Sequence, residues 1–147
     1  MDRIVRAGLA LTLALVLSAA AFAAAQQFKG SIVTFHVEGS SVSRFTLTAS
    51  AFCASASKST SEIRVIQIDG EGEIAADGQF SLTHDKQGTK ASVTGRIKGP
   101  AAEGQFNVRY SKTLTTYDPI THQWKPGVAA CTAKSSWTAR QVEEQKK

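Results

Sequence analysis

The stretch VTFHVEGSSVSRFTLTASAFC, Val33–Cys53, decides the fold of this chain. Val33, Phe35 and Val37 alternate with polar residues, and Phe45 and Leu47 alternate in the same way after an interruption by glycine and serine. A period of two places the apolar side chains of each run on one face, as in half-buried β-strands. The stretch therefore predicts two strands that share one core.

The same alternation recurs along the chain from Phe28 onward, where we find no convincing helical pattern. Residues 62–69, EIRVIQID, are apolar on both faces and predict a central strand. Other runs align the following apolar residues: Phe80 and Leu82; Ala91, Val93 and Ile97; Phe106, Val108 and Tyr110; Trp137 and Ala139. We expect an all-β domain, a single antiparallel β-sandwich or flattened barrel of about 7–9 short strands.

Two similar stretches, ADGQFSLT at 76–83 and AEGQFNVR at 102–109, raise the question of a repeated binding motif. Asp77-Gly78 separates two strand-like runs and predicts a two-residue hairpin loop. The second stretch follows a break at Gly99-Pro100, so Gly104 is expected inside a strand, at a bulge or opposite a bulky ring. We interpret both stretches as architecture.

The order of the segments resembles that of small secreted bacterial β-domains of uncharacterised function. The resemblance rests on four segments and covers most of residues 30–141. The segments are residues 33–53, IQIDGEGEIAADGQFSL, ASVTGRIKGPAAEGQF, and a last cysteine before SSWTARQ. The resemblance implies the fold and no activity.

The first 25 residues have the three parts of a secretory signal peptide. Arg3 and Arg6 precede an apolar run, and small residues end in an A-x-A site. We expect cleavage between Ala25 and Gln26; an uncleaved anchor over residues 7–25 is the alternative. Residues 26–141 then form the β-domain, and residues 142–147 form a charged tail.

Export predicts a periplasmic or secreted protein that meets a membrane only through the uncleaved signal. Cleavage leaves 15 of the 17 basic and 11 of the 12 acidic residues, a net charge of +4. The charge is spread without a run of Lys or Arg, which is typical of a solvated surface; a patch for an anionic polymer is the alternative. A nucleic-acid partner is not expected. In an oxidising compartment, Cys53 and Cys131 predict one structural disulfide.

Signs of catalysis are missing from the sequence. The three histidines, His36, His84 and His122, lie far apart, and the pair His84-Asp85 falls in THDKQGTK, which predicts a flexible loop. The residues 55–61 are rich in serine, but nothing identifies a base for a nucleophile. We expect no catalytic residue, metal or cofactor.

The stretch TLTTYDPITHQWKPG, residues 113–127, is the best candidate for a binding surface. Tyr117, His122 and Trp124 are the candidate contacts, with Lys125 available for an anionic group. The alternative is a longer hairpin in which Tyr117 and Trp124 pair across strands or cover the edge of the core.

These observations predict an exported, non-enzymatic binding or envelope-associated module whose ligand is unknown. An envelope polymer or a secreted protein is the expected class of partner. A proteinaceous inhibitor of a secreted hydrolase is one alternative, because a rigid loop loses little entropy on binding. A hydrolase with an unrecognised site is the other.

Overall fold

A computed structural model describes residues 24–143 of the chain. The described residues form strands and turns and contain no helix. The strands are β1 (Gln26–Lys29), β2 (Val33–Glu38), β3 (Ser41–Ala54), β4 (Ser59–Ile68), β5 (Gly72–Glu73), β6 (Gln79–Lys86), β7 (Thr89–Lys98), β8 (Ala101–Asp118) and β9 (Gln123–Gln141). The predicted all-β fold is confirmed, although β3, β8 and β9 are longer than expected, with 14, 18 and 19 residues.

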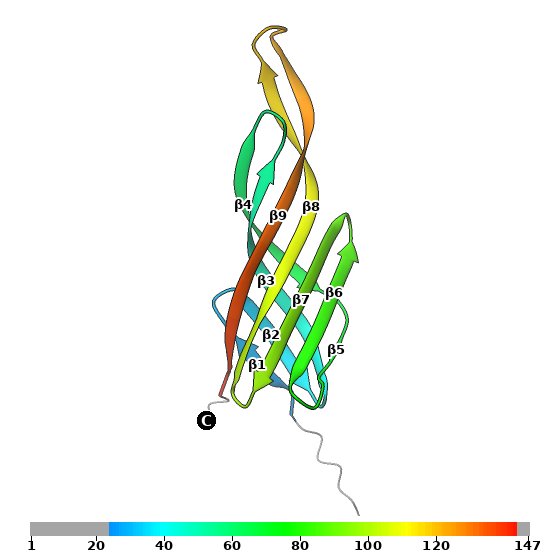
Figure 1. The fold of residues 1–147 in the computed structure, drawn as a ribbon, viewed down its shortest axis with the longest axis vertical. Helices are drawn as coiled ribbons and strands as arrows, with labels where there is room; N and C mark the ends of the chain where they lie inside the picture. Colours follow the sequence, from blue (N-terminus) through cyan, green and yellow to red (C-terminus); the bar gives the residue numbers. More distant parts are fainter. Residues whose placement is uncertain (1–23, 144–147) are drawn as a thin grey trace, which may run out of the picture.

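The strands form one antiparallel sheet in the order β4-β3-β2-β1-β9-β8-β7-β6. The sheet curls so that β6–β9 lie in front of β1–β3 (Figure 1). Beyond the end of β2, β3 pairs directly with β9, from Phe52↔Thr132 to Ala54↔Ala130. The curled sheet is therefore closed where β3 meets β9, whereas β4 and β6 are its free edges.

Aromatic side chains from both layers meet in the core. Phe35 stacks on Phe28 with ring centroids 5.0 Å apart, and the ring of Trp137 from the opposite layer meets Phe35 edge-on at 5.8 Å. Trp137 contacts Phe45 in the same edge-on way at 5.7 Å. Offset and edge-on aromatic pairs add to the free energy gained from burial. The alternation that predicted Phe35, Phe45 and Trp137 as core residues is confirmed.

The position of Gly104 explains the glycine in the second acid-Gly-Gln-Phe stretch, residues 102–109. It lies in β8 directly opposite Trp137 of β9. A Cβ atom on Gly104 would lie 2.5 Å from the Trp137 ring and 2.0 Å from the carbonyl oxygen of Thr94. The expectation of a glycine opposite a bulky ring is confirmed, and the turn at Gly99-Pro100 is present.

Cys53 and Cys131 form the predicted disulfide. They are directly opposite each other in β3 and β9, with Cα atoms 4.0 Å apart. The bond joins two residues separated by 78 positions in sequence and lies near the upper end of the core. A buried disulfide is typical of proteins in an oxidising, extracytoplasmic environment.

Three local expectations were wrong. All of residues 62–69 except Asp69 belong to β4, which lies at the edge of the sheet rather than in its centre. Asp77-Gly78 forms a turn before β6, but β5 pairs with β3 at Ser41 and Val42, so the turn does not join a hairpin. THDKQGTK is no flexible loop: its residues belong to β6 and β7, joined by the tight turn Gln87-Gly88, where both residues have positive φ.

The predicted signal peptide falls largely on residues 1–23, outside the described residues. The expected first residue after cleavage, Gln26, is also the first residue of β1. At the other end β9 stops at Gln141, and residues 144–147 of the predicted tail are outside the description.

Candidate functional site

The longest hairpin of the protein extends beyond the core. Tyr110 and Cys131 are the last pair in β8 and β9 with both side chains buried. From Ser111↔Ala130 the two strands continue to pair as far as Asp118↔Gln123. Ala129 is the last core residue of this hairpin, so we call residues 113–128 the arm. Figure 1 shows it projecting past the rest of the described residues, at the end opposite β1 and the last residues of β9.

Asp118 organises the turn at the tip of the arm, residues 119–122. Its Oδ1 accepts hydrogen bonds from the backbone N–H groups of Ile120, at 2.9 Å, and Thr121, at 3.3 Å. An aspartate that bonds the backbone two residues on is a common way to hold a tight turn. His122 completes the turn with a φ of 51°. The tip is thus held by specific bonds although it is solvated.

Aromatic side chains occupy one face of the tip. Tyr117 and Trp124 form a directly opposed cross-strand pair with ring centroids 5.3 Å apart. The Tyr117 hydroxyl lies 3.0 Å from Nδ1 of His122, within hydrogen-bond distance. Trp124 is 68% exposed and Tyr117 43% exposed. The pair therefore presents its rings to solvent and does not cover the core.

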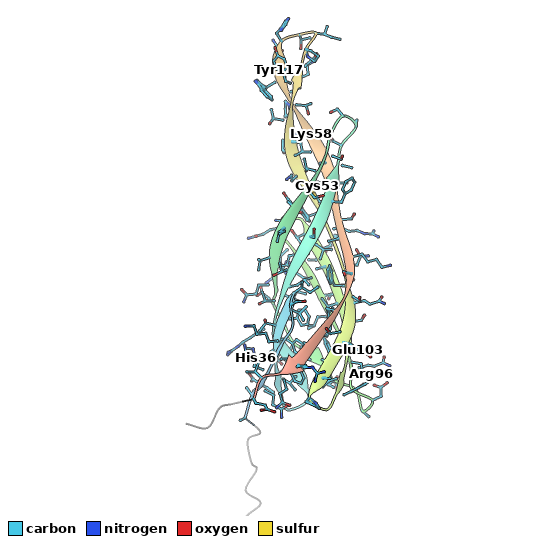
Figure 2. The ribbon with its side chains drawn as sticks, turned by 90° about the vertical axis from the view of Figure 1, so that its left-hand side faces the viewer. His36, Cys53, Lys58, Arg96, Glu103 and Tyr117 are labelled. Carbon is cyan, nitrogen blue, oxygen red and sulfur yellow. A yellow bond between two sulfur atoms is a disulfide. The ribbon has the colours of Figure 1, made fainter. Side chains whose placement is uncertain are left out.

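The opposite face of the tip is polar. Lys125 donates a hydrogen bond from Nζ to Oδ2 of Asp118 at 2.5 Å. This bond, together with the backbone N–H groups of Ile120 and Thr121, lowers the pKa of Asp118 to about 2. A small hollow lies on this side between the arm and Ser57 of the β3–β4 loop. Figure 2 shows Tyr117 and Lys58 of that loop at the same end of the molecule.

The structure brings the four candidate residues of the sequence to one tip, but it separates their roles. Tyr117, His122 and Trp124 form a contiguous cluster. Lys125 neighbours Thr116 on the other face, and its ammonium group is paired with Asp118. Asp118 and Lys125 are the only Asp, Glu, Lys or Arg residues between 113 and 128. Within the arm, the other neighbours of the aromatic cluster are therefore neutral.

A polar cluster inside the fold was missed by sequence reasoning. Glu62 of β4 accepts hydrogen bonds from the Tyr110 hydroxyl and from Nζ of Lys112, while the guanidinium group of Arg64 lies 4.1 Å from the centre of the Tyr110 ring. The bond from Lys112, followed by that from Tyr110, lowers the pKa of Glu62. Burial, and then the bond to Glu62, raises the pKa of Tyr110. Since 48 positions separate Glu62 from Tyr110, no local pattern could have paired them.

This cluster lies beside the disulfide. Cys53, Cys131 and Glu62 approach one another closely enough to suggest metal ligands, but the two sulfur atoms are bonded to each other. The fold does not bring the three histidines together: His36 lies in β2, His84 in β6 and His122 in the arm. We assign the cluster a structural role, in which it closes the upper end of the core with paired polar groups.

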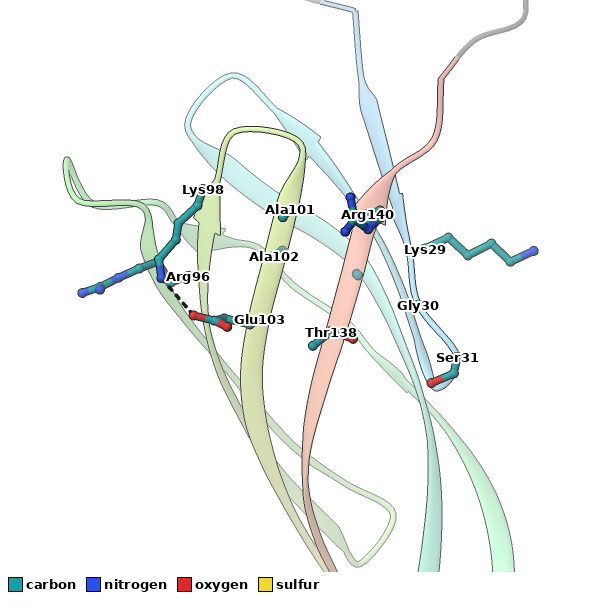
Figure 3. A pocket seen from close by; sticks show the side chains of 11 residues that line it. Lys29, Gly30, Ser31, Arg96, Lys98, Ala101, Ala102, Glu103, Thr138 and Arg140 are labelled. Carbon is teal, nitrogen blue, oxygen red and sulfur yellow. Dashed lines mark hydrogen bonds and ion pairs between the residues drawn. The ribbon is translucent and has the colours of Figure 1, made fainter.

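A second hollow lies at the other end of the molecule (Figure 3). Lys29, Arg96, Lys98 and Arg140 line it, but Lys29 and Arg96 extend in opposite directions and Lys98 is bonded to Glu103 at 3.0 Å. Cations that point apart do not form a site for one small anion. The tip of the arm is the better candidate.

No family model, curated protein or solved structure matches the chain. Within residues 24–143 there is no helix of the length and apolarity needed to cross a membrane.

Proposed function

We propose that the protein is an exported, non-enzymatic binding module of the periplasm or cell surface, and that the tip of the arm is its recognition surface. The observation that carries the proposal is the exposed Tyr117–Trp124 pair at the end of the arm. Aromatic side chains gain free energy when they are covered, so a well-held exposed pair is typical of binding surfaces.

The absence of unpaired charge around the two rings favours a neutral ligand. Asp118 and Lys125 neutralise each other on the opposite face. The aromatic face offers two rings, the Tyr117 hydroxyl and the His122 imidazole. Such a surface suits stacking on the apolar face of a sugar ring with hydrogen bonds to its hydroxyl groups. An envelope polysaccharide is therefore the first candidate ligand.

A narrow projecting arm also suits the alternative, inhibition of a secreted hydrolase. A hairpin whose turn is held by Asp118 enters a cleft with little loss of conformational entropy. The two candidates differ in what is captured: a polysaccharide in one case, an enzyme in the other.

The test is a pull-down from cell-envelope extracts with the immobilised exported protein and with Trp124→Ala. Val142→Ala is the control, because Val142 is also an exposed apolar residue but lies beside β1, where its N–H group bonds to the carbonyl of Gln27. We expect the control to retain the captured polymer and Trp124→Ala to lose at least about tenfold in affinity, as when a central aromatic contact is removed. Equal capture by both variants would contradict the proposal.

A further inference from the structure

A second candidate interaction surface is the free edge of β4, away from the tip of the arm. The inference drawn from this edge does not depend on the proposed function. Within the described chain, β4 pairs with β3 alone. Its pairing with β3 is regular over all ten residues, from Phe45↔Ile68 to Ala54↔Ser59. Proteins usually protect such an edge with a proline, a bulge or a short strand. β4 has none of these, and only its inward-facing Glu62 and Arg64 are charged.

The hydrogen bonds of the β3–β4 turn show which backbone groups face the free edge. The N–H group of Ser55 donates to the carbonyl of Lys58 at 2.8 Å, so these two residues form a hydrogen-bonded pair. Because such pairs alternate along an antiparallel ladder, the even-numbered residues of β4 bond to β3. The N–H and C=O groups of Ser61, Ile63 and Val65 therefore point to the free edge.

The same residues present apolar side chains to solvent. Ile63 is 76% exposed and Val65 is 66% exposed. Phe52 of β3, which is 53% exposed, pairs with Ser61 and so lies diagonally from Ile63 on the same outer face. A strand that combines free backbone groups with exposed β-branched side chains is a template for the addition of another strand.

We propose that β4 pairs antiparallel with β4 of a second copy of this chain, about a two-fold axis at Ile63. The charges of the strand favour this occupant. Pairing of Ile63 with its own copy places Glu62 opposite Arg64 of the partner, and Arg64 opposite Glu62 of the partner. These opposite charges would occupy the non-hydrogen-bonded positions, where facing side chains are closest. Glu62 already accepts bonds from Tyr110 and Lys112 of its own chain, so the partner's Arg64 would join this network as a further cation.

The resulting dimer would bring the exposed apolar side chains of the two copies side by side. Ile63 faces its own copy, and Val65 faces Ser61 of the partner, on the outer face of a continuous sheet. The upper part of β4 has room for this pairing, because the hairpin of β3 and β4 rises clear of β6 and β7 in Figure 1. From Arg64 downward β4 lies across a hollow from the β6–β7 hairpin, with Arg64 and Val65 on one side and Lys86 on the other. Below this hollow, Lys86 bonds Asp69 at 2.8 Å, so the partner strand would enter the hollow.

Sedimentation equilibrium of the exported protein tests the dimer, with Ile63→Lys as the variant and Val128→Lys as the matched control. Val128 is a β-branched residue with 72% exposure in the arm, outside the proposed edge. We expect a concentration-dependent dimer that Val128→Lys retains and that Ile63→Lys weakens about tenfold or more, because the new charges face each other across the axis. Thermal unfolding of both variants shows that they are folded.

Disulfide trapping tests the register. Ile63→Cys should form a bond between two copies under mild oxidation, because facing residues of a hydrogen-bonded pair have Cα atoms about 5.5 Å apart, within disulfide range. Val65→Cys should cross-link more slowly, and peptide mapping identifies the bonded residues. Faster trapping at Val65→Cys would overturn the register. A protein that remains monomeric at about 100 μM and fails to cross-link at either position would overturn the dimer. Cross-links only to a different polypeptide in envelope extracts would assign the edge to another partner.

Discussion

Trp137 and Trp124 lie on the same strand, 13 positions apart, in two opposite environments. Trp137 is 3% exposed and contacts aromatic rings of the facing layer. Trp124 is 68% exposed and contacts the ring of Tyr117 from the neighbouring strand. Strand pairing is continuous between the two positions. What changes along β9 is therefore the presence of a second layer, and packing across layers should decide how much each tryptophan contributes to stability.

The largest effect is expected for Trp137→Ala. The substitution removes the ring that contacts Phe35 and Phe45 and leaves a cavity in front of Gly104. Large-to-small core substitutions of this kind cost about 3–5 kcal/mol in the free energy of unfolding. Urea unfolding monitored by circular dichroism measures the loss. A cost below about 1 kcal/mol would mean that the two layers do not pack as described.

Reduction of the disulfide is the next largest perturbation, and it acts at the border between the two regions. Cys53–Cys131 joins β3 to β9 just below the arm. Loss of a disulfide that closes a long loop costs about 2–4 kcal/mol, chiefly through the entropy of the unfolded chain. We expect Cys53→Ala/Cys131→Ala to unfold at lower urea concentration than the oxidised protein. A midpoint unchanged by the double substitution or by reductant would show that the sheet alone fixes this pairing.

The contrast between covered and exposed parts of the sheet also explains which features could be predicted from the sequence. Alternation identified the core strands because one face of each is buried, as for Phe35 and Trp137. It misjudged β4, since apolar residues on both faces suggest burial on both faces, whereas Ile63 and Val65 are exposed. Periodicity records which residues are apolar and says nothing of which elements cover them.

The arm illustrates a second limit. Residues 113–127 were predicted as a binding surface because they contain Tyr117 and Trp124. The structure shows the alternative, a longer hairpin in which these two residues form a cross-strand pair. The pairing of Lys125 with Asp118 could not be predicted, because it depends on the register of β8 against β9. Glu62 and Tyr110 depend in the same way on contacts between distant strands.

A small effect on stability is expected for Trp124→Ala. The substitution removes a solvent-exposed ring and its contact with Tyr117. Cross-strand pairs of this kind contribute about 0.2–1 kcal/mol, so the free energy of unfolding should fall by less than about 1 kcal/mol. Urea unfolding beside Trp137→Ala makes the comparison direct. A loss as large as that of Trp137→Ala would show that the tip is part of the cooperative core and would remove the reason to assign it to binding.

The smallest expected effect is a local change at the tip at low pH. The pKa of Asp118 is about 2, below its ordinary value of 3.8, because Lys125 and the turn N–H groups bond to the carboxylate. A group whose pKa is lower in the folded state stabilises the fold above its ordinary pKa, and this contribution is lost as the pH falls toward the folded value. The hydrogen bonds to Ile120 and Thr121 should therefore weaken between about pH 4 and pH 2 while the core remains folded. Amide NMR shifts of these two residues measure the transition, and Asp118→Asn, which keeps an oxygen acceptor but does not titrate, should abolish it. A midpoint near 4 would mean that Lys125 does not hold Asp118 in solution and that the ammonium group is free for an anionic ligand.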